Sequence, residues 1–279
     1  MHRDYEHLLS FNASYKQGGS MVTRYVFITG ATSGIGYGIA QILASKGHHI
    51  AYNGLADFED IIAISDKLKD LGAASVHYFD ADMRNGDAVR EMITTAEFTM
   101  GPIDVLINNA GIQHVAPIEK FPISRWDDLI AVNLTANFHT IASVIDGMRA
   151  RGFGRIINIS SVHGLIASAN KSAYVSAKHG VVGLTKAIAL ECATDGITVN
   201  AICPGWVRTP LVEAQIHDRS EVSSRSFEEE ASILIQERQP NRTFVTPEQI
   251  GSLCLYLMSE AAASVTGMAV PIDGAWTAH

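Results

Sequence analysis

Short apolar runs alternate with amphipathic stretches from residue 24 to the end of the chain, and this alternation constrains the fold most. Seven runs have the length and apolar character of buried strands: YVFIT, HHIAYN, SVHYFDA, DVLINNA, GRIINIS, ITVNAIC and MAVPID. Helical periodicity fills the intervals 34–46, 57–71, 86–99, 124–150, 172–194 and 247–258. Nearly continuous apolar strands separated by helices indicate a parallel sheet with helices on both faces. The sequence therefore predicts a single α/β domain, doubly wound around seven parallel strands.

Two helix starts and one irregular segment refine this prediction. Ser124 and Asp127 have the spacing of a capping box, and Thr246-Pro247-Glu248 combines a cap, a first-turn proline and an early acid. The segment 208–245 follows the sixth strand, is polar and charged, and is expected to form two helical pieces. Ligands bind at the carboxyl edge of such sheets, so we interpret this segment as a lid over the site. A helix pair at a subunit interface and a plain insertion are the alternatives.

Charge and cysteine content limit the classes of partner and compartment. With 21 Lys and Arg against 29 Asp and Glu, the net charge is −8, which argues against nucleic acid as a partner. Cys192, Cys203 and Cys254 show no C-x-x-C pairing, which favours buried thiols in a reducing, cytoplasmic compartment. No apolar run is expected to span a membrane. Residues 1–21 lack the pattern of a secretory signal and are interpreted as a leader or tag-like extension, with a native extension as the alternative.

The stretch ITGATSGIG, residues 28–36, connects the first strand to the first helix. A glycine loop in this position directs backbone N–H groups and the positive end of a helix toward one point, which suits a pyrophosphate. Its spacing is Gly30-x3-Gly34-x-Gly36 rather than the common G-x-G-x-x-G. The loop alone is therefore compatible with either a nucleotide site or a flexible turn.

Tyr174 and Lys178 lie four residues apart in the segment 160–180, hence on one face of a helix. A phenol is a poor acid–base catalyst at neutral pH unless its anion is stabilised, and an ammonium one turn away supplies that stabilisation. A serine at the end of the preceding strand can hold the substrate oxygen. The alternative is an ordinary pair of residues on a helix surface.

Taken with NNAG at 108–111, these segments resemble the short-chain dehydrogenase/reductase family over essentially all of residues 22–279. The matching positions are Thr29-Gly30-x3-Gly34-Ile35-Gly36, Asn108-Asn109-Ala110-Gly111, Asn133, Ser161, Tyr174-x3-Lys178 and Pro204-Gly205. The resemblance implies a Rossmann-type fold and hydride transfer between a nicotinamide and an alcohol or carbonyl.

The resemblance also implies roles for individual residues. Tyr174 is expected to be the acid/base, Ser161 to orient the carbonyl, Lys178 to bind ribose hydroxyls and lower the tyrosine pKa, and Asn133 to support a water relay to Lys178. The family spacing of thirteen residues before the tyrosine selects Ser161 over Ser160. The residues expected at the cofactor are Gly30, Thr32, Ser33, Gly34, Ile35, Gly36, Asp82, Met83, Asn109, Gly111, Tyr174, Lys178, Pro204, Val207 and Thr209.

The end of the second strand bears on the choice between NAD and NADP. A 2′-phosphate needs a basic partner there, but no Lys or Arg occurs from 47 to 66. NAD is therefore the predicted cofactor. The sequence departs from the usual NAD pattern, because Asn53-Gly54-Leu55 stands where a strand-end aspartate is common and Asp57 lies further along.

Polar residues near the expected catalytic positions indicate a small carboxylate substrate. Each has an ordinary structural explanation alone, but together they resemble the D-3-hydroxybutyrate dehydrogenases of the family. The matching stretches are NNAGIQHVAPIE, SSVHGLIASANKSAYVSAKHGVVGLTK, PGWVRTPLVEAQI and DGAWTAH. By this resemblance Gln113, His163, Lys171 and Gln215 grip the carboxylate, and Trp276 shapes the pocket around the acyl chain.

Several alternatives stay open at this point. A reductase of another small oxo compound, such as the thioester acetoacetyl-CoA, is the nearest rival, although the acidic run Glu228-Glu229-Glu230 disfavours a phosphate-rich carrier. A nucleotide-sensing regulator without catalysis would not need the serine, tyrosine and lysine. The histidines show no metal-ligand spacing, so no metal site is predicted. The family is commonly tetrameric, and the helices 124–150 and 172–194 would form the interfaces.

Overall fold

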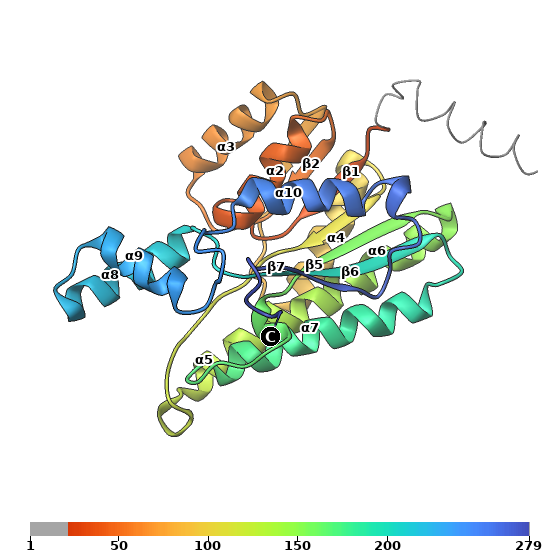
Figure 1. The fold of residues 1–279 in the computed structure, drawn as a ribbon. Coiled ribbons are helices and arrows are strands. Elements are labelled where there is room, and N and C mark those ends of the chain that lie inside the picture. The colour runs from red at the N-terminus through yellow and green to blue at the C-terminus, as the bar shows by residue number, and fades with distance from the viewer. Residues whose placement is uncertain (1–21, 279) are drawn as a thin grey trace, which may run out of the picture.

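Seven parallel strands form the central sheet of the computed structural model, which describes residues 22–278 (Figure 1). The leader assigned to residues 1–21 lies outside the described residues. The strands follow the order β3-β2-β1-β4-β5-β6-β7. Their bounds are β1 Tyr25–Ile28, β2 His49–Tyr52, β3 Ser75–Tyr78, β4 Val105–Asn108, β5 Gly154–Ile159, β6 Ile197–Pro204 and β7 Ala269–Ile272. The predicted doubly wound sheet is confirmed.

The direction in which the chain adds strands reverses between β1 and β4, which are neighbours although two strands separate them in sequence. Open α/β sheets bind ligands at such a switch point, outside the carboxyl ends of the strands. The topology therefore assigns the loops after β1, β4, β5 and β6 to one site.

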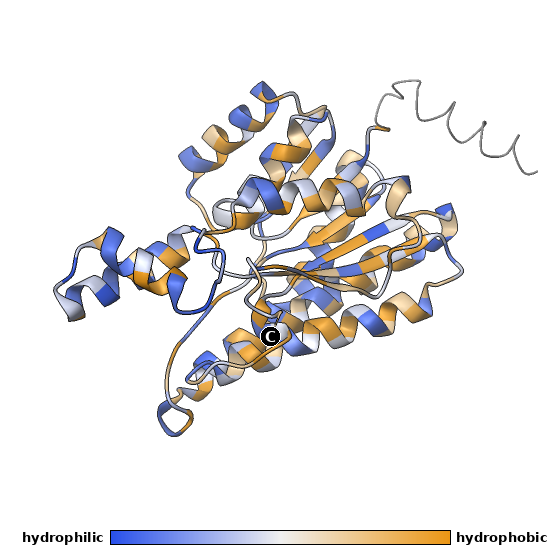
Figure 2. Ribbon diagram, viewed as in Figure 1, coloured by the Kyte–Doolittle hydropathy of each residue, from blue (hydrophilic) through white to orange (hydrophobic). Residues whose placement is uncertain are grey.

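Helices cover both faces of the sheet, because each face buries its own apolar core. One core joins the strands to α2 Gly34–Ala44, α3 Phe58–Asp70 and α10 Pro247–Leu257. The other joins them to α4 Gly86–Met100, α6 Ala136–Arg151 and α7 Ser172–Glu191. Figure 2 shows the hydrophobic residues concentrated along the strands and on the helix faces turned toward them. Burial from both sides explains why the strand sequences are apolar throughout.

The predicted helix 124–150 is more complex than its sequence indicates. It consists of α5 Ile123–Ile130, a π-helical turn over Ala131–Thr135, and α6. The predicted capping box at Ser124 is wrong, because Pro122 occupies the cap position and makes no side-chain cap bond. The cap at Thr246 is confirmed, as its hydroxyl accepts a hydrogen bond from the backbone N–H of Gln249.

The same continuous helical segment, Ile123–Arg151, is long and apolar enough to cross a membrane by length and composition, contrary to the expectation from sequence. Its buried residues Ile141, Val144 and Met148 belong to the core between α4, α6 and the sheet. The core helix of a globular protein meets the same criteria, and the packing accounts for its hydropathy.

The segment 208–245 forms two helices, as predicted, namely α8 Pro210–Ser223 and α9 Phe227–Gln236. They pack on each other through a small apolar cluster that includes Val212, Ile216 and Leu234. Figure 1 shows them side by side beyond the edge of the sheet. An isolated bridge between Val207 and Val245 joins the two ends of the excursion. The pair is therefore a separate unit on a narrow base.

Candidate active site

Two adjoining cavities lie at the carboxyl edge of the sheet, and both are bordered by His163, Lys171, Trp206 and Gln215. The larger, about 320 Å³, extends toward α8 and α9. The smaller extends toward the glycine loop and α7. Residues predicted for the cofactor, for proton transfer and for the substrate therefore meet in one region.

The glycine loop requires its glycines for two different reasons. Gly30 and Gly34 have φ angles of 63° and 56°, a region that side chains with a Cβ disfavour. A Cβ on Gly36 would lie 2.4 Å from both Asn109 Nδ2 and the Gly30 carbonyl oxygen. Asn109 Nδ2 donates to that same oxygen at 2.8 Å and so fixes the loop against the end of β4. The loop is a rigid cradle rather than a flexible turn.

The first turn of α2 presents backbone donors at this cradle. Its N-cap residue, Ser33, makes no side-chain cap hydrogen bond. The first N–H groups of a helix have no partner within the helix, and together with the helix dipole they form a site for anions. Thr32 faces the other way and donates from its hydroxyl to the Leu55 carbonyl at 3.0 Å. The residues present therefore fit the pyrophosphate of a dinucleotide.

The end of β2 is closed by neutral groups. Asn53 is buried and donates from Nδ2 to the carbonyls of Phe79 and Ala81 at 3.1 and 3.3 Å. Asp57 caps α3 by accepting from the Asp60 backbone N–H at 2.9 Å. Its carboxylate is thus engaged in the cap of α3.

Asp82 and Met83, expected beside the adenine, lie after β3 near the same edge. Asp82 is engaged with Arg84, whose Nη2 lies 2.7 Å from Asp82 Oδ2. Hydrogen bonds from this arginine lower the pKa of Asp82. Met83 packs against the core on the α4 side of the sheet. The ion pair with Arg84 was not foreseen from the sequence.

Asn133 lies within the π-helical turn and is completely buried. Its Oδ1 accepts from the Ile112 N–H at 2.8 Å, and its Nδ2 donates to the Ile112 carbonyl at 2.9 Å. A Cβ on Gly111 would lie 3.2 Å from Asn133 Oδ1 and 3.7 Å from Lys178 Nζ. The amide thus positions the NNAG loop beside Lys178, and single-turn π-helices are common at functional sites.

The two adjacent serines after β5 have different partners. Ser160 Oγ donates to the backbone carbonyl of Lys178 at 3.0 Å, so this hydroxyl is committed to α7, although Ser160 also borders the smaller cavity. Ser161 Oγ accepts from the His163 N–H at 3.1 Å and lies 3.5 Å from His163 Nδ1. Of the two hydroxyls, that of Ser160 is the one that donates to a backbone carbonyl, and the choice of Ser161 stays a prediction.

Tyr174 and Lys178 share one face of α7, beneath the NNAG loop. Lys178 is 4% exposed, and its Nζ donates to the Ile159 carbonyl at 2.8 Å and lies 5.6 Å from the centre of the Tyr174 ring. Burial lowers the pKa of Lys178 to about 8, so the ammonium form dominates at neutral pH. Burial raises the pKa of Tyr174, and the nearby Ser161 side chain opposes this shift. The expected lowering of the tyrosine pKa is therefore not seen, because burial is the largest influence.

The four residues predicted to grip a carboxylate border the cavities together. Gln215 on α8 donates from Nε2 to Gln113 Oε1 at 3.2 Å, which links the helix pair to the loop after β4. Burial, with a contribution from Lys171, lowers the pKa of His163 to about 4, so this imidazole is neutral at pH 7. Burial also lowers the pKa of Lys171, which forms no ion pair with any described residue. The group has donors and one unneutralised cation, as an anion requires.

Two tryptophans form the apolar wall of the larger cavity. Trp276, predicted from the sequence, has its ring centre 5.7 Å from that of His163 and 5.7 Å from that of Trp206. Trp206 was missed, although it directly follows the quoted Pro204-Gly205 pair. Lys171 Nζ lies 5.2 Å from the centre of its ring. Trp206 thus contacts the cation of the group directly.

The remaining residues expected at the cofactor also border the smaller cavity, namely Ile35, Pro204, Val207 and Thr209. Thr209 caps α8 through its side-chain oxygen, and its Cγ2 would lie 3.4 Å from a Cβ on Gly34. The base of the helix pair therefore adjoins the glycine loop. Within residues 22–278, no three His, Cys, Asp or Glu side chains are grouped to hold a metal ion.

Comparisons with known proteins agree with this geometry. The model of the short chain dehydrogenase family matches residues 24–220. The D-beta-hydroxybutyrate dehydrogenase of Rhizobium meliloti (strain 1021) is 47% identical over 258 residues, covering 92% of this chain and 100% of the relative. A protein of the same name from Cupriavidus necator is 48% identical over 253 residues, covering 90% and 97%. A solved structure of a variant actinorhodin polyketide ketoreductase with NADPH superposes with a TM-score of 0.86 at 34% identity, covering 92% and 98%.

Proposed function

The chain belongs to the short-chain dehydrogenase family, and from this premise we propose that it is an NAD-dependent enzyme that interconverts D-3-hydroxybutyrate and acetoacetate. Membership makes it an oxidoreductase but does not define the substrate, which depends on the pocket. The observation that carries the proposal is that Lys171, His163, Gln113 and Gln215 border the cavity that also contains Tyr174. The names of the two curated relatives support the same substrate.

Tyr174 is the proposed acid/base and Ser161 the group that orients the reacting oxygen. A nicotinamide dinucleotide bound along the glycine loop would accept hydride from C3 of the hydroxy acid or deliver hydride to the oxo acid. The raised pKa of Tyr174 keeps the phenol protonated, which is the form that donates a proton to acetoacetate during reduction. In the oxidative direction the phenolate must form, and the Lys178 ammonium stabilises it.

Lys178 retains the capacity for a second task. Its ammonium has three N–H donors, and the Ile159 carbonyl occupies one of them. The other two are available for ribose hydroxyls, in agreement with the predicted role. Asn133 acts as a positioning residue, because both polar atoms of its amide are used by the Ile112 backbone. A water relay would then depend on the NNAG loop that this amide holds in place.

The carboxylate of the substrate would bind among the four polar side chains. Lys171 supplies the charge, while neutral His163 and the two glutamines supply hydrogen bonds. Fixing the carboxylate fixes which face of C3 meets the cofactor, and such positioning is a large component of catalysis. We propose that 208–245 acts as a lid that brings Gln215 to the substrate and excludes water.

The preference for NAD rests on the end of β2. Asn53 and Gly54 stand there, Leu55 is exposed, and no Lys or Arg occurs from 47 to 66 to receive a 2′-phosphate. Arg84, the nearest arginine after β3, is paired with Asp82. These features support NAD over NADP.

We also propose a cytoplasmic homotetramer formed by residues 22–279 as one catalytic domain. Ile123, Phe138 and Leu190 are apolar yet exposed on the helices expected to form the interfaces. Light scattering coupled to size-exclusion chromatography measures the number of subunits, and a monomeric mass would contradict this part of the proposal.

The substrate is tested with the two enantiomers of 3-hydroxybutyrate. We expect NAD reduction, followed at 340 nm, with the D enantiomer and at least a tenfold slower rate with the L enantiomer. Equal rates would show that the residues proposed to bind the carboxylate do not select one face of C3. No rate with either would refute the proposed substrate.

A further inference from the structure

Five charged side chains border the larger cavity, and they do not contribute equally to its charge. They are Lys171, Asp218, Arg219, Glu237 and Arg238. The protein as a whole carries a net charge of −8, which repels an anionic substrate. The cations that remain unpaired at the cavity therefore decide how an anion approaches it.

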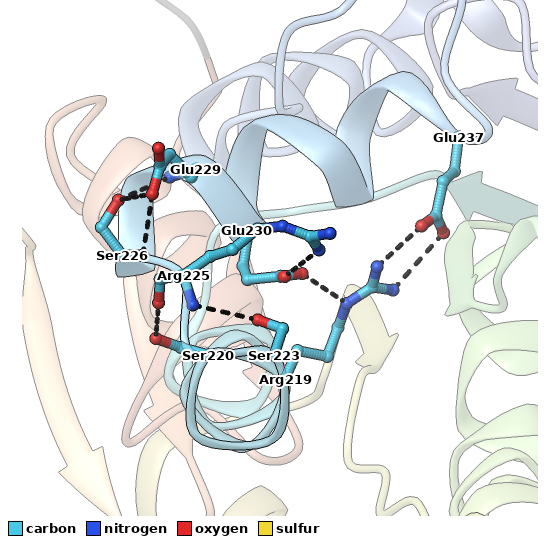
Figure 3. Close-up of polar contacts among 8 residues, drawn as sticks. All are labelled: Arg219, Ser220, Ser223, Arg225, Ser226, Glu229, Glu230 and Glu237. Carbon is cyan, nitrogen blue, oxygen red and sulfur yellow. Dashed lines mark hydrogen bonds and ion pairs between the residues drawn. The ribbon is translucent and has the colours of Figure 1, made fainter.

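Arg219 is neutralised by an ion-pair network between α8 and α9 (Figure 3). Its Nε lies 3.1 Å from Glu230 Oε2, and its Nη2 lies 2.7 Å from Glu237 Oε1. Arg225 Nη1 lies 2.9 Å from the other oxygen of Glu230. Two arginines thus meet two glutamates, and the network contributes no net charge to the cavity.

Glu230 keeps this network in place. The residue is 1% exposed, and hydrogen bonds from Ser223, Arg225 and Arg219 lower its pKa to about 2. It is therefore ionised at every pH at which the enzyme is expected to work. If Arg219 turned toward a substrate, the buried Glu230 carboxylate would lose one of its two arginine partners, which is costly.

Arg238 differs from Arg219 in its exposure and in its lack of an ion pair. It follows α9, is exposed, and borders the cavity without an ion pair to any residue in the described range 22–278. The pKa of His163 is lowered first by burial, then by the charge of Lys171, and then by the charge of Arg238. The charge of Arg238 is therefore felt at the cavity wall. Lys171, the other unpaired cation, is buried. Among residues 22–278, Arg238 is thus the exposed cation of this cavity that has no ion pair.

We propose that Arg238 is a specificity-determining residue that recruits carboxylate substrates to the cavity before Lys171 binds them. The inference rests on the proposed function, since it assumes turnover of a small oxo acid. A charge at the rim of a site changes the association rate and its salt dependence more than it changes the bound state. Arg238 therefore favours ionised oxo acids over neutral oxo compounds of similar size.

Asp218 supplies an internal check on the sign of the effect. It borders the same cavity, is exposed, and forms no ion pair within the described part of the chain. Its negative charge opposes that of Arg238. Removing the negative charge of Asp218 should therefore favour ionised oxo acids, whereas removing the positive charge of Arg238 should disfavour them.

The test compares acetoacetate with its neutral methyl ester as substrates for NADH oxidation at low and high salt. In the Arg238→Gln variant we expect kcat/KM for acetoacetate to fall roughly three- to tenfold at low salt, through KM. The deficit should shrink at high salt, because exposed charges are screened. The ester should be unaffected. Asp218→Asn should raise kcat/KM for acetoacetate, and Lys67→Gln on α3, which removes an equal charge far from the cavity, should leave it unchanged.

Other results would contradict either the role of Arg238 or the proposed function. An equal loss for acid and ester would mean that Arg238 has a structural role, and an unchanged kcat/KM for acetoacetate would mean that it does not recruit the substrate. Either result would overturn the inference while the wild-type rate with acetoacetate upholds the proposed function. No wild-type turnover of acetoacetate would show that both proposals are wrong.

Discussion

Replacing Lys171 with methionine tests how much its positive charge contributes to binding the carboxylate of the substrate. The methionine side chain is apolar and of similar length, so it can keep the packing against Trp206 while it removes the ammonium. Lys171 is 9% exposed and has no ion pair in the described residues, and its ammonium lies over the Trp206 ring. A buried cation without a partner favours the neutral form, in agreement with the lowered pKa of Lys171.

The size of the effect follows from the hydrogen bond that would be lost. A hydrogen bond to a charged group contributes about 1.5–3 kcal/mol, and 1.4 kcal/mol corresponds to a factor of about ten. We therefore expect KM for acetoacetate to rise about 10- to 150-fold in the Lys171→Met variant. Methyl acetoacetate carries no charge, so its KM should change much less. The melting temperature should stay the same or rise, because an uncompensated buried charge is removed.

Steady-state NADH oxidation with both substrates, together with a thermal melt, measures these quantities. Lys186→Met, at an exposed position on the same helix as Tyr174, is the matched control. An unchanged KM for acetoacetate would show that Lys171 does not bind the carboxylate of the substrate. A fall in melting temperature with equal losses for acid and ester would show that Lys171 stabilises the fold instead.

The remaining predictions concern the proton donor, the loop and pH. Tyr174→Phe should reduce turnover below detection while NADH still binds, as measured by fluorescence; retained turnover would exclude Tyr174 as the acid/base. Gly36→Ala places a Cβ 2.4 Å from two neighbouring atoms and should weaken NADH binding at least tenfold, whereas Gly183→Ala, with open space around its Cβ, should leave binding intact. Equal binding by both variants would contradict the cradle. KM for acetoacetate should be flat from about pH 6 to 7, because the pKa of His163 is near 4. It should rise on the alkaline side, because the ammonium of Lys171 is lost above its lowered pKa, and Lys171→Arg should suppress that rise; a rise that persists in the arginine variant would assign it to another group.

The fold was predictable because its determinants are local or periodic. The apolar runs around Val26, Ile107 and Val199 read as strands with both faces buried, and alternation with helices leaves few topologies. The π-helical turn at Asn133 was not predictable, since it depends on the fit between its amide and the Ile112 backbone, which is distant in sequence. Local patterns cannot report such long-range contacts.

The site shows the same division. Tyr174 and Lys178 were identifiable by their helical spacing and by resemblance, whereas the raised pKa of Tyr174 depends on burial that only the packed structure defines. The run Glu228-Glu229-Glu230 suggested an acidic lid, but Glu230 is buried between Arg219 and Arg225. Which charges remain unpaired at the cavity could be decided only after α8 and α9 were seen packed together.

The most direct test of the account follows absorbance at 340 nm with purified protein, acetoacetate and either NADH or NADPH. Rapid loss of absorbance with NADH, and at most a small fraction of that rate with NADPH, is the predicted result, because the end of β2 offers neutral groups to the ribose. A rate with NADPH alone would contradict the cofactor assignment. No rate with either cofactor, in protein that still binds NADH, would contradict the proposal that Lys171 and its neighbours bind the carboxylate of the substrate.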